Sequence, residues 1–176
     1  MRPHDPRPVD VLAHPGSGQA HHRALLAQCS ALLRTLDADA MTEAPGPDPC
    51  NTIGGHLRHL LDHHEALVEG WSTGRIDYAA RRRNTPCERD PARALARIEA
   101  IDASLENLPA EESSSITVLR EDGSVTASTV ARELDFVASH TTHHLAIVAL
   151  LAHVLDLTVP TDLGVAVSTL RYRRTG

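Results

Sequence analysis

Apolar residues recur at helical spacing in four long segments of the chain. In the first, leucines and a cysteine three or four positions apart predict a helix over residues 19–37. Equivalent stripes predict helices over residues 51–70, 91–108 and 128–156. Prolines and a glycine crowd residues 44–49, where a loop is expected. Four amphipathic helices bury their stripes by packing together, so the sequence predicts an all-α four-helix bundle.

Local signals define where two of these helices begin and what precedes the last one. Asn51 can cap the second helix, and Asp90 followed by Pro91 is an N-cap with proline at the first helical position. Before the last helix, β-branched residues surround a turn at residues 120–123, which predicts a short β-hairpin over residues 115–126. We expect this hairpin to be an insertion into the bundle and not a second domain.

The two ends of the chain lack the long apolar stripes of the helices. Residues 1–18 are rich in proline, histidine and aspartate and have no apolar core, so a flexible tail is expected there and not a signal peptide. The bundle itself is expected over residues 19–156. Residues 157–176 are expected to form a C-terminal tail that packs on or near the bundle.

Composition excludes several classes of function. The formal net charge of −6 gives no basic surface for nucleic acid. All seventeen basic residues are arginines, which excludes Schiff-base chemistry and a P-loop lysine. The three cysteines form no Cys-x-x-Cys pair, so we expect neither a disulfide framework nor a thiolate zinc site, and a reducing cytoplasm is the expected location. No apolar run approaches the ~18 residues of a membrane span.

Histidines concentrate in two of the predicted helices. Seven of the twelve fall within residues 55–64 and 139–145, and clustered imidazoles on helices favour a metal site. Ferritin-like di-iron centres need Glu-x-x-His, and no glutamate here has a histidine three residues later. Hemerythrin-like centres need His-x-x-x-Glu, which the histidines of the first window also lack. These comparisons favour a mononuclear site built from histidines.

The helix geometry pairs two of these histidines. His140 and His144 are four residues apart, so their side chains lie one turn apart on the same face of the helix. A third nitrogen from the second helix would complete a set of three and leave a position for water or substrate, as in catalytic zinc sites. His59, His56 or His63 can supply it, and the helix geometry alone does not choose among them.

Two segments together resemble a known family. The His-Leu-Leu-Asp sequence at residues 59–62 and the His-Thr-Thr-His-His sequence at residues 140–144 are similar to those of the DinB/YfiT-like superfamily of four-helix bundles. The resemblance covers roughly residues 19–156 and implies an up-down-down-up bundle. It also implies that His59, His140 and His144 bind one divalent metal ion. Zinc is the first expectation, and nickel or iron would also accept imidazole ligands.

The same resemblance carries expectations about activity. The family includes thiol-dependent S-transferases and isomerases that use bacillithiol, mycothiol or glutathione, together with members of unknown activity. It implies a metal-dependent S-transferase that takes a small-molecule thiol and an electrophilic substrate and forms a homodimer, with no catalytic side chain identified. The alternative is a non-catalytic metal-binding or stress-associated bundle, or a dimerisation module. In that case a fourth ligand such as His63 or His56 would close the site.

Carboxylates, arginines and the other histidines complete the candidates. Glu133 and Asp62 could orient the ligands, although both could equally be solvated surface groups. Arginines near the second helix and in the C-terminal tail could bind carboxylates of a thiol cofactor or substrate, or be surface charge; they are Arg82, Arg83, Arg171 and Arg173. We expect two hydrogen-bonded core histidines, His64 and His143. Five others are expected to be solvated or bonded locally: His4, His14, His21, His22 and His153.

Overall fold

The structure is a computed structural model that describes residues 18–80, 82–108 and 114–175. The N-terminal tail expected at residues 1–18 lies outside the described residues except for Gly18, where the first helix begins. His4 and His14 therefore also lie outside them.

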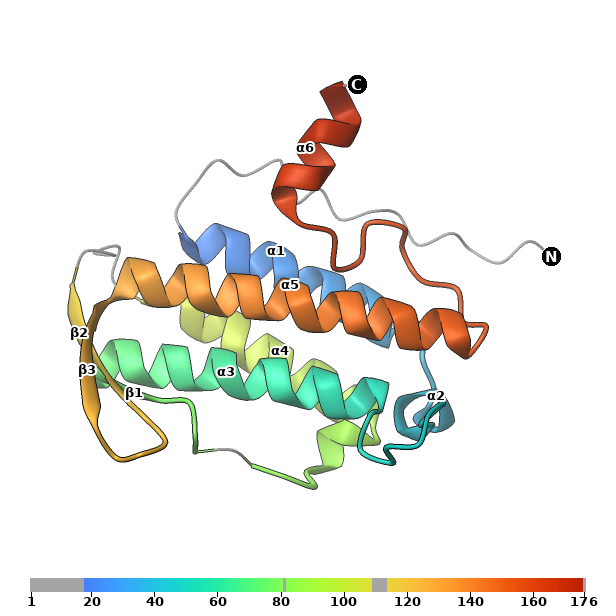
Figure 1. Cartoon of the computed structure of the whole chain (residues 1–176), viewed down its shortest axis with the longest axis horizontal. Helices are drawn as coiled ribbons and strands as arrows, with labels where there is room; N and C mark the ends of the chain where they lie inside the picture. Colours follow the sequence, from blue (N-terminus) through green and yellow to red (C-terminus); the bar gives the residue numbers. More distant parts are fainter. Residues whose placement is uncertain (1–17, 81, 109–113, 176) are drawn as a thin grey trace.

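Four long helices form the bundle: α1 (Gly18–Leu33), α3 (Ile53–Thr73), α4 (Pro91–Glu106) and α5 (Val130–Val154). The chain runs along α1 in one direction, returns along α3 and α4, and runs forward again in α5 (Figure 1). This order confirms the expected up-down-down-up bundle. Because α3 and α5 are antiparallel neighbours, residues more than eighty positions apart in sequence meet across them.

Side-chain caps fix where the helices begin. Asp90 caps α4 by accepting hydrogen bonds from the backbone N–H groups of residues 92 and 93, as predicted. The cap of α3 is Thr52, whose side chain accepts from the backbone N–H of Gly55, and not Asn51. The Asn51 side chain is instead bonded to His56, one turn into the helix.

The first predicted helix is two helices in the structure. α1 ends at Leu33, four residues before the expected end, and Asp37 then caps a separate short helix, α2 (Ala38–Thr42). The Asp37 side chain accepts a hydrogen bond from the backbone N–H of Ala40 at 2.8 Å. An aspartate that caps a new helix ends the preceding one, although the apolar spacing continues across the break.

The predicted hairpin is present and belongs to a larger sheet. β2 (Ser115–Leu119) and β3 (Val125–Thr129) pair antiparallel, and β1 (Arg75–Asp77) adds a parallel edge with Arg75 opposite Thr117. The pattern did not predict β1 because three residues are too few for an alternation. Gly74 ends α3 with φ +77°, a left-handed conformation that glycine adopts without steric cost, and turns the chain into β1.

The C-terminal segment contains a helix that the sequence pattern did not predict. α6 (Val167–Thr175) is polar almost throughout, and it projects from the bundle (Figure 1). Before it, Leu163 is buried and Gly164 lies against α5. A Cβ atom at Gly164 would lie 2.2 Å from the backbone nitrogen of Ala146, so only glycine permits this approach.

The buried apolar side chains form two clusters. The larger one joins leucines of α1, α3 and α5 with isoleucines of α4. The smaller one lies at the sheet end of the bundle, where Trp71 and Ile76 pack with Ile116 and the first turns of α5. No helix in the described part of the chain is both long and apolar enough to cross a lipid bilayer.

Two histidines lie inside the bundle, away from the predicted metal site. His64 is fully buried and hydrogen-bonded, as expected, but His22 is also fully buried and links α1 to two other helices. His22 Nδ1 lies 3.1 Å from His64 Nε2, while the outer nitrogens lie 3.0 Å from the Leu134 carbonyl oxygen and 2.9 Å from that of Leu60. The two neutral imidazoles donate their protons to these carbonyl oxygens, and burial disfavours the uptake of a further proton by either ring.

Acid should therefore destabilise the fold through this pair. Below about pH 6.5 the unfolded chain protonates both histidines, whereas burial lowers the pKa of His22 and His64 in the folded protein. The free energy of unfolding should fall as the pH falls, by about 1.4 kcal/mol per pH unit for each proton that only the unfolded chain binds. Urea unfolding with chelator present, repeated at several pH values, measures this slope.

The contribution of the pair is separated by substitution. His64→Gln should reduce the slope, while His153→Gln, at an exposed position near the end of α5, should leave it unchanged. Equal slopes in the wild-type protein and in His64→Gln would contradict the role of the buried pair.

Candidate metal centre

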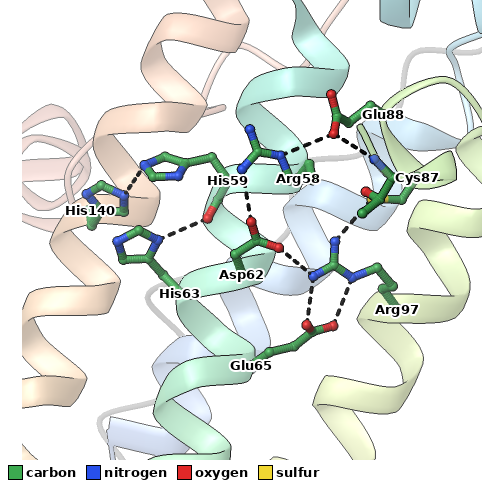
Figure 2. Close-up of polar contacts among 10 residues, drawn as sticks. Arg58, His59, Asp62, His63, Glu65, Cys87, Glu88, Arg97 and His140 are labelled. Atoms are coloured by element: carbon green, nitrogen blue, oxygen red, sulfur yellow. Dashed lines mark hydrogen bonds and ion pairs between the residues drawn. The ribbon is translucent and has the colours of Figure 1, made fainter. Parts of the chain in front are cut away.

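Three histidine side chains from two helices converge near the middle of the bundle. His59 of α3 and His140 and His144 of α5 each offer one ring nitrogen, and the three nitrogens lie within 4.8 Å of one another. The Nε2 atoms of His59 and His140 are 3.1 Å apart, and Figure 2 shows the two rings facing each other across the helix pair. The convergence is a product of the antiparallel contact between α3 and α5.

The donor set fits a divalent metal ion. Burial, together with the neighbouring imidazoles, lowers the pKa of His140 and His144 to about 3, so both rings are neutral near pH 7 and keep a free lone pair. Two nitrogens bound to one zinc ion at about 2.0–2.1 Å lie roughly 3.0–3.4 Å apart. The separation between His59 and His140 is within that range. The site could therefore hold a divalent ion with little rearrangement of these two rings.

His56 does not belong to the group of three but contacts one of its members. Its Nδ1 lies 2.8 Å from Nδ1 of His144, and its Nε2 lies 2.8 Å from Oδ1 of Asn51. A carbonyl oxygen only accepts, so Nε2 of His56 carries the proton, and Nδ1 of this neutral ring accepts from Nδ1–H of His144. Nε2 of His144 then has a lone pair and no proton. The chain from Asn51 through His56 thus sets the tautomer that a metal ligand requires.

His63, the other alternative from the sequence, packs against the site. Its Nδ1 donates to the backbone carbonyl of His59 at 3.0 Å. Its ring stacks on that of His140, with centroids 4.1 Å apart, and on Tyr78 on the other side at 5.2 Å. The Tyr78 hydroxyl in turn donates to Glu133 at 2.9 Å. The stack limits how the His140 ring can turn.

The two carboxylates proposed to orient the ligands have other hydrogen-bond partners. Asp62 accepts hydrogen bonds from Arg58 and Arg97. Glu133 is fully buried and accepts from Ser128, Arg132 and Tyr78, so it reaches the site only through the aromatic stack. Neither is a solvated surface group, because Asp62 is only 7% exposed at its side chain. Their role is to fix neighbouring elements.

A network of arginines and carboxylates joins α4 to α3 next to the metal centre. Arg97 of α4 lies 2.8 Å from oxygens of both Asp62 and Glu65, and its Nη1 donates to the buried Cys87 Sγ at 3.1 Å (Figure 2). Cys87 lies in the short 3-10 helix η1 (Pro86–Glu88). Arg58 of α3 contacts Asp62 at 2.9 Å and Glu88 at 3.4 Å. The network fixes η1 against α3 next to His59.

A cavity opens beside the three histidines. Its volume is about 650 Å³, and it is lined by His59, His144 and His56 together with residues of α3 and of the segment around η1. Arg83 lines this cavity, whereas Arg82 lines a separate one with the carboxylates of Asp62 and Glu65. The other two candidate arginines, Arg171 and Arg173, are exposed on α6.

Three further histidines lie outside the convergent group and its contacts. His143 is exposed and not a core residue, because it lies about 100° around α5 from His144, on the side that faces solvent. His21 is half-buried, and its Nε2 is a buried atom with no hydrogen-bond partner among the described residues. His153 is exposed, as expected.

Comparison with known proteins agrees with the fold and with the histidine cluster. The family model described as DinB superfamily matches residues 21–148. The chain belongs to the DinB superfamily. The match spans the four long helices up to the second half of α5, and it includes all three convergent histidines of this DinB protein. Searches of curated proteins and of solved structures find no significant match.

Sequence reasoning missed three residues that support the DinB site. The sequence indicated Asn51 as a helix cap, but its side-chain amide oxygen instead accepts a hydrogen bond from His56. Tyr78 and Arg97 act through contacts with residues 32 to 55 positions away, which no local pattern marks. Their aromatic or basic character alone did not distinguish them from surface residues.

Asn51 is linked to His144 through His56, so we expect its removal to affect metal binding. Asn51→Ala should weaken binding of a divalent ion about 10- to 100-fold, the usual cost of removing a group that orients a ligating histidine. Competition with a chromogenic zinc chelator measures the affinity. Asn107→Ala, at the end of α4, is the matched control. Equal affinities in Asn51→Ala and the wild-type protein would contradict the role of the chain.

Proposed function

We propose that His59, His140 and His144 bind one divalent metal ion, with zinc as the first expectation and nickel or iron as alternatives. The observation that supports this most directly is the convergence of three ring nitrogens within 4.8 Å. Membership of the DinB superfamily supports it independently. The neutral state of His140 and His144 supplies the lone pairs that coordination requires.

We further propose that the protein is a metal-dependent thiol S-transferase. The cavity lined by His59 and His144 gives a small molecule access to two of the three candidate ligands, which favours a catalytic over a closed site. A divalent ion held there would lower the pKa of a bound thiol and favour the thiolate, the nucleophilic form. The thiol proton would pass to solvent when the thiolate forms. The sulfur would then form a bond to an electrophilic carbon while the bond between that carbon and its leaving group breaks, and the leaving group would depart with the electron pair.

The residues of the chain would hold this site rigid. His56 and Asn51 keep a proton on Nδ1 of His144, so that Nε2 carries the lone pair. His63 and Tyr78 limit rotation of His140 by stacking. Bacillithiol, mycothiol and glutathione are the candidate thiols, with an electrophilic small molecule as the second substrate.

The proposal also includes a cellular location and an oligomeric state. Three free cysteines, two of them buried, fit a reducing cytoplasm. A homodimer is supported by Leu150 and Val154, which expose 66% and 62% of their surface one turn apart on α5.

A non-catalytic metal-binding, stress-associated or dimerisation bundle is the alternative function. It would be favoured if His56, 2.8 Å from His144, became a fourth ligand and closed the site. The bond between His56 and Asn51 argues against this, because it holds the His56 ring in its present orientation.

Metal content tests the site itself. Purified protein supplemented with zinc should contain close to one divalent ion per chain, and His140→Ala should lose most of it because two ligands no longer enclose the ion. His59→Ala should lose as much, whereas His143→Gln, at the exposed position next to His144, should retain full content. Elemental analysis after dialysis gives the stoichiometry. Full retention in His59→Ala, with loss in His56→Ala or His63→Ala, would show that the ligand from α3 has been misassigned.

Thiol binding tests the chemistry. In cobalt-substituted protein, a thiol that enters the open position should add a sulfur-to-metal charge-transfer band. Transfer of that thiol to an electrophile should accompany the band, and both should disappear in His144→Ala. Absorption spectroscopy with mycothiol, bacillithiol and glutathione measures the first effect, and an assay of free thiol measures the second. A spectrum that none of the three changes would favour the non-catalytic bundle.

A further inference from the structure

The cavity beside the three histidines is strongly basic within an acidic protein. Three arginines line it, namely Arg58, Arg83 and Arg89. Among the described residues that line it, Glu88 is the only carboxylate. The whole chain has a formal net charge of −6, so this excess of positive charge is local.

Glu88 does not neutralise the charge of Arg83 or Arg89. Oε1 of Glu88 accepts the backbone N–H of Thr85 at 3.0 Å and lies 3.4 Å from Nε of Arg58. Arg58 also binds Asp62. Arg83 and Arg89 are exposed and form no ion pair with any carboxylate in the described ranges. Their guanidinium groups are therefore available to a ligand.

The neighbouring cavity shows that this arrangement is not a general property of the surface. Arg82, adjacent to Arg83 in sequence, lines a cavity with four carboxylates and one further arginine: Asp62, Glu65, Glu69, Asp77 and Arg75. One arginine of a consecutive pair thus lies in acidic surroundings, and the other lies in the histidine cavity. The pair offers a matched comparison.

The segment that carries the two arginines is held firmly over α3. A Cβ atom at Gly54 would lie 1.9 Å from the carbonyl oxygen of Glu88, so only glycine allows η1 to approach the start of α3. Cys87 is buried and accepts a hydrogen bond from Arg97. Asn84 adopts φ +55°, a left-handed conformation that asparagine tolerates better than most residues. Arg83 and Arg89 therefore flank a fixed element.

We propose that Arg83 and Arg89 form a subsite for the carboxylate groups of the small molecule whose reactive end lies at His59, His140 and His144. Guanidinium groups bind carboxylates with paired, charge-assisted hydrogen bonds, and two of them suit a ligand with more than one carboxylate. The inference deepens the proposed function, on which it rests for the position of the thiol. It assigns the substrate class as anionic, carboxylate-bearing molecules.

The first test needs neither thiol nor metal. Calorimetric titration of chelator-treated protein with succinate should show binding that Arg83→Gln and Arg89→Gln each weaken about tenfold, the low end of the effect of a hydrogen bond to a charged group. Arg82→Gln should bind succinate as the wild-type protein does, and Arg83→Lys should retain part of the affinity. Equal succinate affinity in all four variants would overturn the subsite.

The second test places the carboxylates relative to the metal. In cobalt-substituted protein, mercaptosuccinate should produce the charge-transfer band at about 100-fold lower concentration than 2-mercaptoethanol, about tenfold for each arginine engaged. Arg83→Gln and Arg89→Gln should reduce this preference without changing the response to 2-mercaptoethanol. The spectra are repeated in Cys50→Ser, because Cys50 also lines the cavity and its sulfur must not contribute.

The outcomes separate the two proposals. If neither thiol gives a band but succinate binding still depends on Arg83 and Arg89, the thiol chemistry fails and the carboxylate subsite stands. If both thiols give bands at the same concentration in the wild-type protein, the metal centre stands and the carboxylate subsite is overturned.

Discussion

The antiparallel contact between α3 and α5 is the feature on which the site depends. It places His59 against His140 with 3.1 Å between their Nε2 atoms, although the two residues are 81 positions apart. Buried apolar side chains on both helices hold the contact, with Leu57, Leu60 and Leu61 on α3 and Leu145 and Val148 on α5. The same apolar stripes that make the bundle therefore also set the distance between the imidazoles.

Placing several imidazoles side by side in a partly buried region costs stability unless they stay neutral. The protein meets this constraint in two ways. Around the candidate metal centre, His56 donates to Asn51 and His63 donates to the backbone carbonyl of His59. In the separate pair of His22 and His64, backbone carbonyls of Leu134 and Leu60 take the protons. Neutral rings with defined tautomers are suitable both for a hydrophobic core and for coordination of a cation.

The segment between β1 and α4 determines which charged side chains line the cavity beside the site. Its 3-10 helix is anchored by Arg97 through Cys87 and by the close approach of Glu88 to Gly54. Because this element is fixed, the charges next to it are fixed too, and the two consecutive arginines at positions 82 and 83 end in cavities of opposite character. The bundle provides the histidines, and the connecting segment determines which small molecules can reach them.

Helical periodicity and cap residues determined the bundle, because amphipathic stripes and signals such as Asp90 before Pro91 act within a few residues. The spacing of His140 and His144 likewise fixed a pair on one face of α5. Spacing left His56, His59 and His63 equivalent, since all three lie within two turns of α3 and only the rotation of that helix against α5 brings His59 into the group. β1 and the burial of His22 were also decided by tertiary contacts, because a three-residue strand and a buried hydrogen bond across 42 residues leave no periodic signal. Local sequence sets which faces can be buried, and only packing decides which side chains meet.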